Sequence, residues 1–263
     1  GSAPLAVPGL SFDGVRIVSS TEALSFDAVP KTLGIVGGGY IGLELGSVWN
    51  RLGSKVTVIE MMSEILPGMY GEISQLLRKE FTRKGIEFHL KAMILEVKDK
   101  ILMMEKEGQT LEIKTDEILV STGRRPVIKG FGLENLGVEI EKGGIKIDEH
   151  CRTNIPNVYA AGDVTGFSML AHTASRESEV AVNYIAGKPD RMRYIAIPEV
   201  VYTNPEIAVV GLAEKEAREK GIEVEVQKLP MTYAGRFVAE NDLFQGLCKI
   251  VTGKKYGEIL GIH

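Results

Sequence analysis

The residues whose types and spacing could do chemistry gather first in a glycine-rich segment, Gly37 to Gly42, which reads Gly-Gly-Gly-Tyr-Ile-Gly. It follows an apolar run typical of a strand, Thr32 to Val36, and precedes a helical stripe of apolar residues. Gly37 permits a tight turn, Gly39 lets the backbone approach a pyrophosphate at the helix N-terminus, and Gly42 lets the helix pack close to the strand. The spacing predicts a dinucleotide-binding loop, with a glycine-rich turn that binds nothing as the alternative.

An acidic residue, Glu60, closes the next predicted strand, Lys55 to Ile59. A carboxylate at this place accepts hydrogen bonds from ribose hydroxyls and repels a 2′-phosphate, so it favours NAD over NADP. Two cations, Arg51 and Lys55, lie near Glu60 in the sequence, so NADP stays the alternative nucleotide.

Two further titratable residues belong to predicted helices. Glu44 follows Gly42 by two positions between two leucines, where a carboxylate on the packed side of the helix would be costly; a solvent-facing position is the alternative. His172 lies near the start of a helix predicted over about 170–185. It is a candidate catalytic base, although a histidine there is more often structural.

A Gly162-Asp163 pair follows a predicted strand, Asn157 to Ala161, and precedes that helix. The aspartate could hold a ligand hydroxyl, and a plain turn is the more usual explanation of such a pair.

The cysteines and histidines give no metal site. Cys151 and Cys248 lie far apart and form no CxxC motif, and no HExxH motif or Cys/His cluster is present. The two cysteines are interpreted as ordinary small hydrophobic residues.

The elements that must position these residues alternate as strand, helix, strand, helix and strand up to about residue 90. Shorter alternating strands with polar turns follow between Ile94 and Ile113, before a strand that ends at Ser121. After about Pro198 strands dominate, with one charged helix near Glu214 to Lys220. The pattern predicts an α/β fold: a doubly wound parallel sheet with an inserted antiparallel β-meander, followed by an incomplete α+β interface domain.

Composition excludes several classes of protein. The 263 residues are 44% apolar and 25% charged, with a formal net charge of −4, which argues against binding nucleic acid or anionic membranes through bulk charge. No apolar run approaches the ~18 residues of a transmembrane helix. No signal-peptide pattern opens the chain, so the expected compartment is the cytoplasm.

Five segments together resemble the flavin disulfide reductase family. They are Gly37 to Gly46, Ser121 to Pro126, Val158 to Val164, Met169 to His172 and Val201 to Glu206. Within the family, the chain is most similar to the dihydrolipoamide dehydrogenases.

The resemblance implies a role for several residues. Asp163 matches the aspartate that holds the ribityl or phosphate region of FAD, and Glu44 matches the glutamate that approaches the redox edge of the flavin and pairs with a lysine. The cofactor-binding residues that we expect for NAD and FAD are Gly37, Gly39, Tyr40, Ile41, Gly42, Glu44, Glu60, Gly123, Asp163, Met169, Leu170, Ala171 and His172. No metal ligand and no catalytic residue of this chain is expected.

The resemblance also implies an order of domains. Residues 1–28 would be the remnant of an FAD domain, 29–123 the NAD-binding domain, 124–193 a central segment completing the FAD site, and 194–263 the first part of the interface domain. The family's Cys-x4-Cys pair, its lysine partner for Glu44 and its His-Glu pair are not found in the sequence, so we expect an internal piece of a longer enzyme that is inactive alone.

The implied activity is NAD-linked oxidation of dihydrolipoamide, with electrons passing from the dithiol to an enzyme disulfide, to FAD and then to NAD. A homodimer and the lipoyl domain of a 2-oxo acid dehydrogenase complex are the expected partners. The alternatives are another flavin disulfide reductase, such as a mercuric reductase or a transhydrogenase, or a non-catalytic module for NAD binding or dimerisation.

Overall fold

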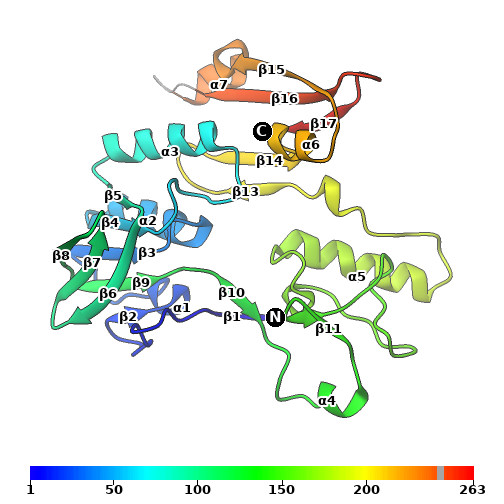
Figure 1. The fold of residues 1–263 in the computed structure, drawn as a ribbon, viewed down its shortest axis with the longest axis horizontal. Helices are drawn as coiled ribbons and strands as arrows, with labels where there is room; N and C mark the ends of the chain where they lie inside the picture. Colours follow the sequence, from blue (N-terminus) through cyan, green and yellow to red (C-terminus); the bar gives the residue numbers. More distant parts are fainter. Residues whose placement is uncertain (242–245) are drawn as a thin grey trace. The chain divides into compact units, whose positions relative to one another are not determined.

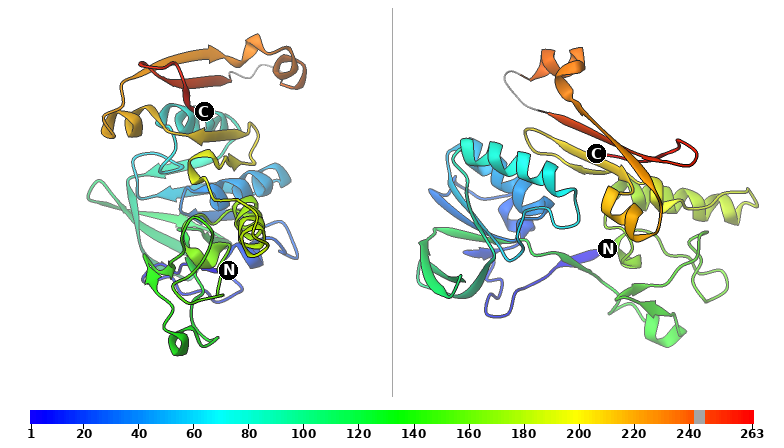
Figure 2. Two further views of the ribbon diagram at one scale, coloured as in Figure 1. Left: turned by 90° about the vertical axis from the view of Figure 1, so that its right-hand side faces the viewer. Right: turned by 45° about the horizontal axis from the view of Figure 1, so that its top comes forward.

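A computed structural model describes residues 1–241 and 246–263. The chain forms two compact units, one of residues 1–6 and 122–197 and the other of residues 7–121 and 198–263. Figures 1 and 2 show the elements of both. Among the described residues, no helix has the length and apolar character needed to cross a membrane.

A five-stranded parallel sheet organises the larger unit. Its strand order is β2 (Ile17–Val18), β9 (Glu117–Val120), β3 (Thr32–Val36), β4 (Lys55–Glu60) and β5 (Glu87–Leu90). Every neighbouring pair is parallel. Three helices belong with it: α1 (Ser20–Ala23), α2 (Tyr40–Leu52) and α3 (Gly71–Arg83). The predicted doubly wound sheet is confirmed.

The two faces of this sheet are covered by different elements. Successive side chains of a strand point to opposite faces, so neighbouring residues of β3 pack in different clusters. Leu33 and Ile35 pack in one cluster with Leu43 of α2 and Leu77 of α3. Val36 instead packs in a second cluster, among Val120, Leu102 and Met104. Figure 2 (right) shows α3 and the meander on opposite sides of the strands.

The meander consists of β6 (Ala92–Lys98), β7 (Ile101–Lys106) and β8 (Gln109–Lys114), paired antiparallel in that order. Its chain reversals fall at the two polar turns that the sequence predicts, where Asp99 and Glu107 adopt φ values of 50° and 52°. The inserted meander is therefore confirmed.

A second sheet in the larger unit is antiparallel, with the order β13 (Glu199–Val201), β14 (Ile207–Gly211), β17 (Ile259–Ile262), β16 (Leu247–Gly253) and β15 (Val224–Pro230). Helices α6 (Glu214–Glu219) and α7 (Gly235–Glu240) and the 3-10 turn η3 (Met231–Tyr233) belong to this part of the chain. Its core contains Leu212, Ala217, Val224 and Val251.

The smaller unit has little sheet. Two short antiparallel pairs join β1 (Ser2–Pro4) to β10 (Arg124–Pro126) and β11 (Ile140–Glu141) to β12 (Gly144–Ile145). Its helices are α4 (Leu133–Leu136), the 3-10 turns η1 (Asp163–Thr165) and η2 (Tyr194–Ala196), and α5 (Ala171–Ile185). Cys151, Val180, Ala181 and Met192 form its buried cluster.

The predicted strand over Asn157–Ala161 is wrong. The structure has only an isolated bridge there, between Arg152 and Tyr159. Thr153 N–H donates to the carbonyl of Val158, and Asn157 adopts a φ of 62°, so the backbone closes a local turn in place of a ladder.

The division into units also differs from the expected boundaries. Residues 7–28 belong to the larger unit, because β2 pairs with β9 and Leu10 is buried in the cluster beneath the meander. The assignment of 1–28, 29–123, 124–193 and 194–263 to parts of a flavoenzyme stays a prediction.

Candidate functional site

The glycine loop connects β3 to α2 at the carboxyl end of the parallel strands. Gly37 adopts a φ of 106°, a conformation that side chains disfavour, and its N–H donates to the carbonyl of Ile59 at 2.9 Å. Its carbonyl accepts a hydrogen bond from the Ser121 hydroxyl at 3.1 Å. The loop is thus tied to both strands that flank β3.

Gly42 is the packing glycine of the loop. A Cβ placed on it would lie 2.4 Å from the carbonyl oxygen of Gly37 and 2.6 Å from Oγ of Ser121. These distances are too short for any side chain, so the first turn of α2 can meet the strand only through glycine.

Gly39 has the opposite surroundings. No atom lies within 4 Å of a Cβ built on it, and it caps α2 without a side-chain hydrogen bond. Within the described part of the chain, no acceptor meets the backbone N–H groups of Tyr40 and Ile41. Open space beside unpaired N–H groups at a helix N-terminus suits an anion such as a pyrophosphate.

The carboxylate of Glu60 is built into the loop. It is only 7% exposed; its Oε2 accepts from Gly38 N–H at 2.7 Å and its Oε1 accepts from Met62 N–H at 2.7 Å. Since a carboxylate can accept about four hydrogen bonds, capacity for a ligand hydroxyl remains.

Two residues of α2 contact the segment around β13. Glu44, which is half-buried, accepts at Oε1 from the N–H of Tyr202 at 2.8 Å. The Tyr40 hydroxyl donates to Glu199 at 3.1 Å, and burial together with that carboxylate raises the pKa of Tyr40 to about 12. Neither contact has a local signal in the sequence.

The Gly162-Asp163 turn lies in the smaller unit. Gly162 adopts a φ of 85° and precedes η1, which begins at Asp163. Oδ2 of Asp163 accepts from the hydroxyl of Ser2, and that hydroxyl accepts from Nε of Arg124 at 2.7 Å. The half-buried aspartate is therefore held in a defined orientation.

The remaining residues predicted for FAD lie in the same unit. Gly123 is exposed, and its carbonyl accepts from the N–H of Leu5. Met169 is half-buried, Leu170 is the N-cap of α5 without a side-chain hydrogen bond, and Ala171 and His172 are exposed on its first turn. The predicted cofactor residues thus form two groups, each assembled within its own unit: the glycine-loop residues in the larger one, and Gly123, Asp163 and 169–172 in the smaller one.

Sequence reasoning missed Glu177. It is fully buried on α5, its Oε2 accepts from Gly162 N–H at 2.6 Å and its Oε1 accepts from the Tyr194 hydroxyl at 2.8 Å. Burial raises its pKa, and the charge of Asp163 adds to the rise. A signal was present, because Glu177 shares helical spacing with Thr173, Val180 and Ala181, the buried stripe of the helix.

Both cysteines are free. Cys151 is buried, which raises the pKa of its thiol to about 12, with smaller contributions from the charges of Glu177 and Asp148. At neutral pH the reactive thiolate is then scarce, consistent with its interpretation as a small core residue.

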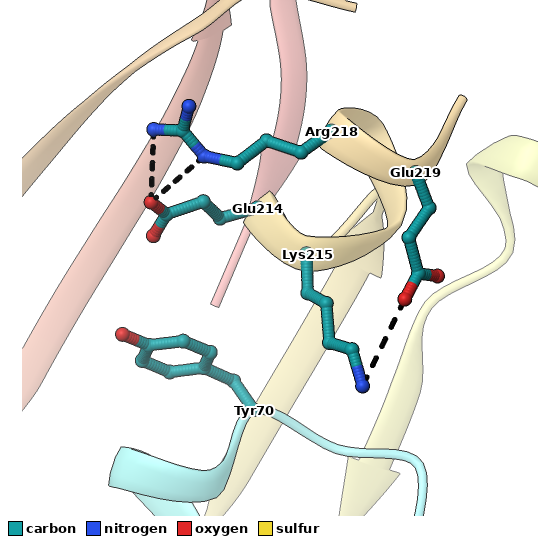
Figure 3. A pocket seen from close by; sticks show the side chains of 5 residues that line it. All are labelled: Tyr70, Glu214, Lys215, Arg218 and Glu219. Carbon is teal, nitrogen blue, oxygen red and sulfur yellow. Dashed lines mark hydrogen bonds and ion pairs between the residues drawn. The ribbon is translucent and has the colours of Figure 1, made fainter. Parts of the chain in front are cut away.

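A cavity of about 430 Å³ lies in the larger unit, lined by Tyr70, Glu214, Lys215, Arg218 and Glu219 (Figure 3). Arg218 pairs with Glu214 at 3.1 Å and Lys215 with Glu219 at 3.8 Å along α6. None of the predicted cofactor residues lines it.

Most of the chain matches two known protein-family models. Residues 1–178 match the family model described as pyridine nucleotide-disulphide oxidoreductase, and residues 197–263 match the model of its dimerisation domain. Mitochondrial dihydrolipoyl dehydrogenase of Pisum sativum is 42% identical over 271 residues, covering all of this chain and 54% of the relative. Dihydrolipoyl dehydrogenase of Geobacillus stearothermophilus is 40% identical, covering 99% and 56%, and leghemoglobin reductase of Glycine max is 41% identical, covering 100% and 51%.

Solved structures agree. LpdA of Mycobacterium tuberculosis matches with a TM-score of 0.89 at 27% identity, over all of this chain and 57% of the other. The HOCl-induced flavoprotein disulfide reductase RclA of Escherichia coli matches with a TM-score of 0.86 at 28% identity, over 100% and 61%. The chain spans about half the length of the curated relatives it matches. It belongs to the pyridine nucleotide-disulphide oxidoreductase family, the flavin disulfide reductases.

Proposed function

We propose that this chain is the nucleotide-binding and interface portion of an NAD-linked dihydrolipoyl dehydrogenase, which oxidises dihydrolipoamide to lipoamide and reduces NAD. The observation that carries the proposal is the glycine loop. It has open space at Gly39, N–H groups at the start of α2 that no acceptor of the described residues meets, and the fixed carboxylate of Glu60 beside them. Relatives of about 40% identity that are named dihydrolipoyl dehydrogenases supply the substrate class.

Each residue of the loop has a proposed task. The N–H groups of Tyr40 and Ile41 bind the pyrophosphate of NAD, and Gly37 and Gly42 hold the turn that presents them. Glu60 accepts from the adenosine ribose hydroxyls. The absence of a side chain at Gly39 leaves room for the phosphates.

The assignment of residues to flavin binding is supported by the family relationship and by the ordered geometry of the Gly162-Asp163 turn. Asp163 binds the ribityl or phosphate part of FAD, with Gly123 and the segment Met169 to His172 around it. Glu44 lies where the nicotinamide meets the flavin. When bound, FAD carries electrons between the dithiol–disulfide pair and the nicotinamide; this chain binds and orients the two cofactors.

Nucleotide choice tests the proposal. The chain should bind NADH more tightly than NADPH in a calorimetric titration, because Glu60 repels a 2′-phosphate. Glu60→Ala should narrow the difference, and Glu87→Ala, which removes an exposed carboxylate on β5, serves as the matched control. Equal affinities, or tighter binding of NADPH to the unaltered chain, would overturn the assignment to NAD.

The activity itself needs the longer protein. We expect the enzyme carrying this chain to form NADH from dihydrolipoamide and NAD, and residues 1–263 alone to form none above background. Turnover of mercuric ion or of a second nicotinamide nucleotide, without lipoamide activity, would favour another disulfide reductase.

The partners and the compartment complete the proposal. The match of residues 197–263 to a dimerisation domain supports a homodimer. The lipoyl domain of a 2-oxo acid dehydrogenase complex is the proposed donor of the dithiol. The cytoplasm remains the predicted compartment, although the Pisum sativum relative is named mitochondrial.

A further inference from the structure

Glu177 is a buried carboxylate without an ion pair. Its side chain is 0% exposed, and among residues 1–241 and 246–263 no cation forms an ion pair with it. A buried charge without a counterion is costly, and an apolar side chain of similar size would fill the position on α5 more cheaply. Packing therefore does not account for a glutamate at this position.

The hydrogen bonds of Glu177 show what the carboxylate holds. Oε2 accepts from Gly162 N–H at 2.6 Å, and Oε1 accepts from the Tyr194 hydroxyl at 2.8 Å. Tyr194 belongs to η2 and lies 17 positions further along the chain. The carboxylate thus joins the turn before α5 to the segment that follows that helix.

The Gly162 peptide groups are fixed on both sides. The N–H is held by Glu177, and the carbonyl accepts from Thr165 N–H at 2.9 Å and from the Thr165 hydroxyl at 3.0 Å. The space beside Gly162 is also tight, because a Cβ built on it would lie 3.3 Å from Cβ of Ala174. Since Asp163 follows directly, the direction of its side chain depends on how this turn is held.

We infer that Glu177 is a positioning residue for flavin binding: its carboxylate fixes Gly162 N–H so that Asp163 is presented in one orientation to the flavin nucleotide. This inference rests on the proposed function, which assigns Asp163 to FAD. In this role Glu177 does not contact the cofactor. It acts through its hydrogen bond to the Gly162 N–H.

The test compares two substitutions of similar size in the full-length, flavin-free protein. Glu177→Gln keeps an oxygen that can accept from Gly162, whereas Glu177→Met fills the space without any acceptor. We expect the Kd for FAD, measured by quenching of flavin fluorescence, to rise at least about tenfold in Glu177→Met and to stay within about threefold in Glu177→Gln. Glu179→Gln, an exposed position on the same helix that pairs with Arg176, is the matched control and should bind FAD as the wild type does.

Amide hydrogen exchange at Gly162 gives a second readout that needs no flavin. The amide should be protected in the wild type and in Glu177→Gln, and should exchange faster in Glu177→Met. Equal FAD affinities in the two variants, or an unprotected Gly162 amide in the wild type, would overturn the inference. If the wild type binds no FAD while the exchange pattern is as expected, the proposed function fails and the structural role of Glu177 stands.

Discussion

The glycine loop and the Gly162-Asp163 turn use the same device in two different units. In each, a glycine N–H donates to a carboxylate from another element: Gly38 to Glu60 at 2.7 Å, and Gly162 to Glu177 at 2.6 Å. Both carboxylates are buried, and both hold backbone that we assign to a cofactor.

The two carboxylates differ in their second partner. Glu60 stands at the end of β4, and its other oxygen accepts from Met62 N–H in the following segment. Glu177 stands in the middle of α5, and its other oxygen accepts from a tyrosine hydroxyl. Glu60, at a strand end, can serve both the loop and a ligand beside it, whereas Glu177, on the buried face of a helix, holds the Gly162 turn and Tyr194 of η2.

The largest expected effect comes from the glycine that packs the loop. Gly42→Ala should lower the free energy of unfolding by about 3 kcal/mol, because its Cβ would overlap the Gly37 carbonyl and the Ser121 hydroxyl. Gly39→Ala, with open space around its Cβ, should cost about 1 kcal/mol or less. Urea denaturation of both variants measures the difference, and equal losses would contradict the packing role of Gly42.

A smaller effect is expected when Glu60 is removed. Glu60→Ala leaves the N–H groups of Gly38 and Met62 without an acceptor, which should cost about 2 kcal/mol of folding stability. Glu60→Gln retains one acceptor and should lose less. If chemical denaturation shows Glu60→Ala to be as stable as the wild type, the Glu60 carboxylate does not hold the loop. The proposed similarity between Glu60 and Glu177 would then be wrong.

Glu177 should make the stability of the folded protein depend on pH. Burial raises the pKa of Glu177 above its ordinary 4.5, with Asp163 adding to the rise and Gly162 and Tyr194 opposing it. Ionisation therefore disfavours the folded state, and stability falls as the pH rises from about 4.5 through the raised pKa. Glu177→Gln has no carboxylate to ionise and does not lose stability in this way. The difference in melting temperature, variant minus wild type, should therefore increase as the pH rises from about 4.5 through the raised pKa. A difference that stays constant from pH 4 to pH 8 would show that Glu177 titrates normally.

The smallest effect is expected at a neighbouring thiol. The charge of Glu177 contributes to the raised pKa of Cys151, so Glu177→Gln should lower that pKa slightly and leave the buried thiol unreactive at neutral pH. Mass spectrometry after maleimide treatment should show labelling of the half-exposed Cys248 well before Cys151 in both proteins. Rapid labelling of Cys151 in the folded wild type would contradict its burial.

The sequence by itself determined the elements that depend on local pattern. Continuous apolar runs predicted β3 and β4, alternating apolar residues predicted the meander, and helical spacing predicted α2 and α3. A helix was also expected over the residues that form α5. The glycine loop and Glu60 were found because the loop, its helix and the acidic strand end follow one another at a regular spacing. Even the meander turns at Asp99 and Glu107 carried a local polar signal.

Only the tertiary structure decided which residues meet across long separations. The strand expected at Asn157–Ala161 became a loop because its backbone bonded locally, and residues 7–28 joined the larger unit through the pairing of β2 with β9. Glu44 meets Tyr202, 158 positions away, and Glu177 meets Gly162 across the start of a helix. Side-chain hydrogen bonds of this kind depend on how separate elements pack, and their geometry leaves no period in the sequence, so the support behind the cofactor turns became visible only in the folded chain.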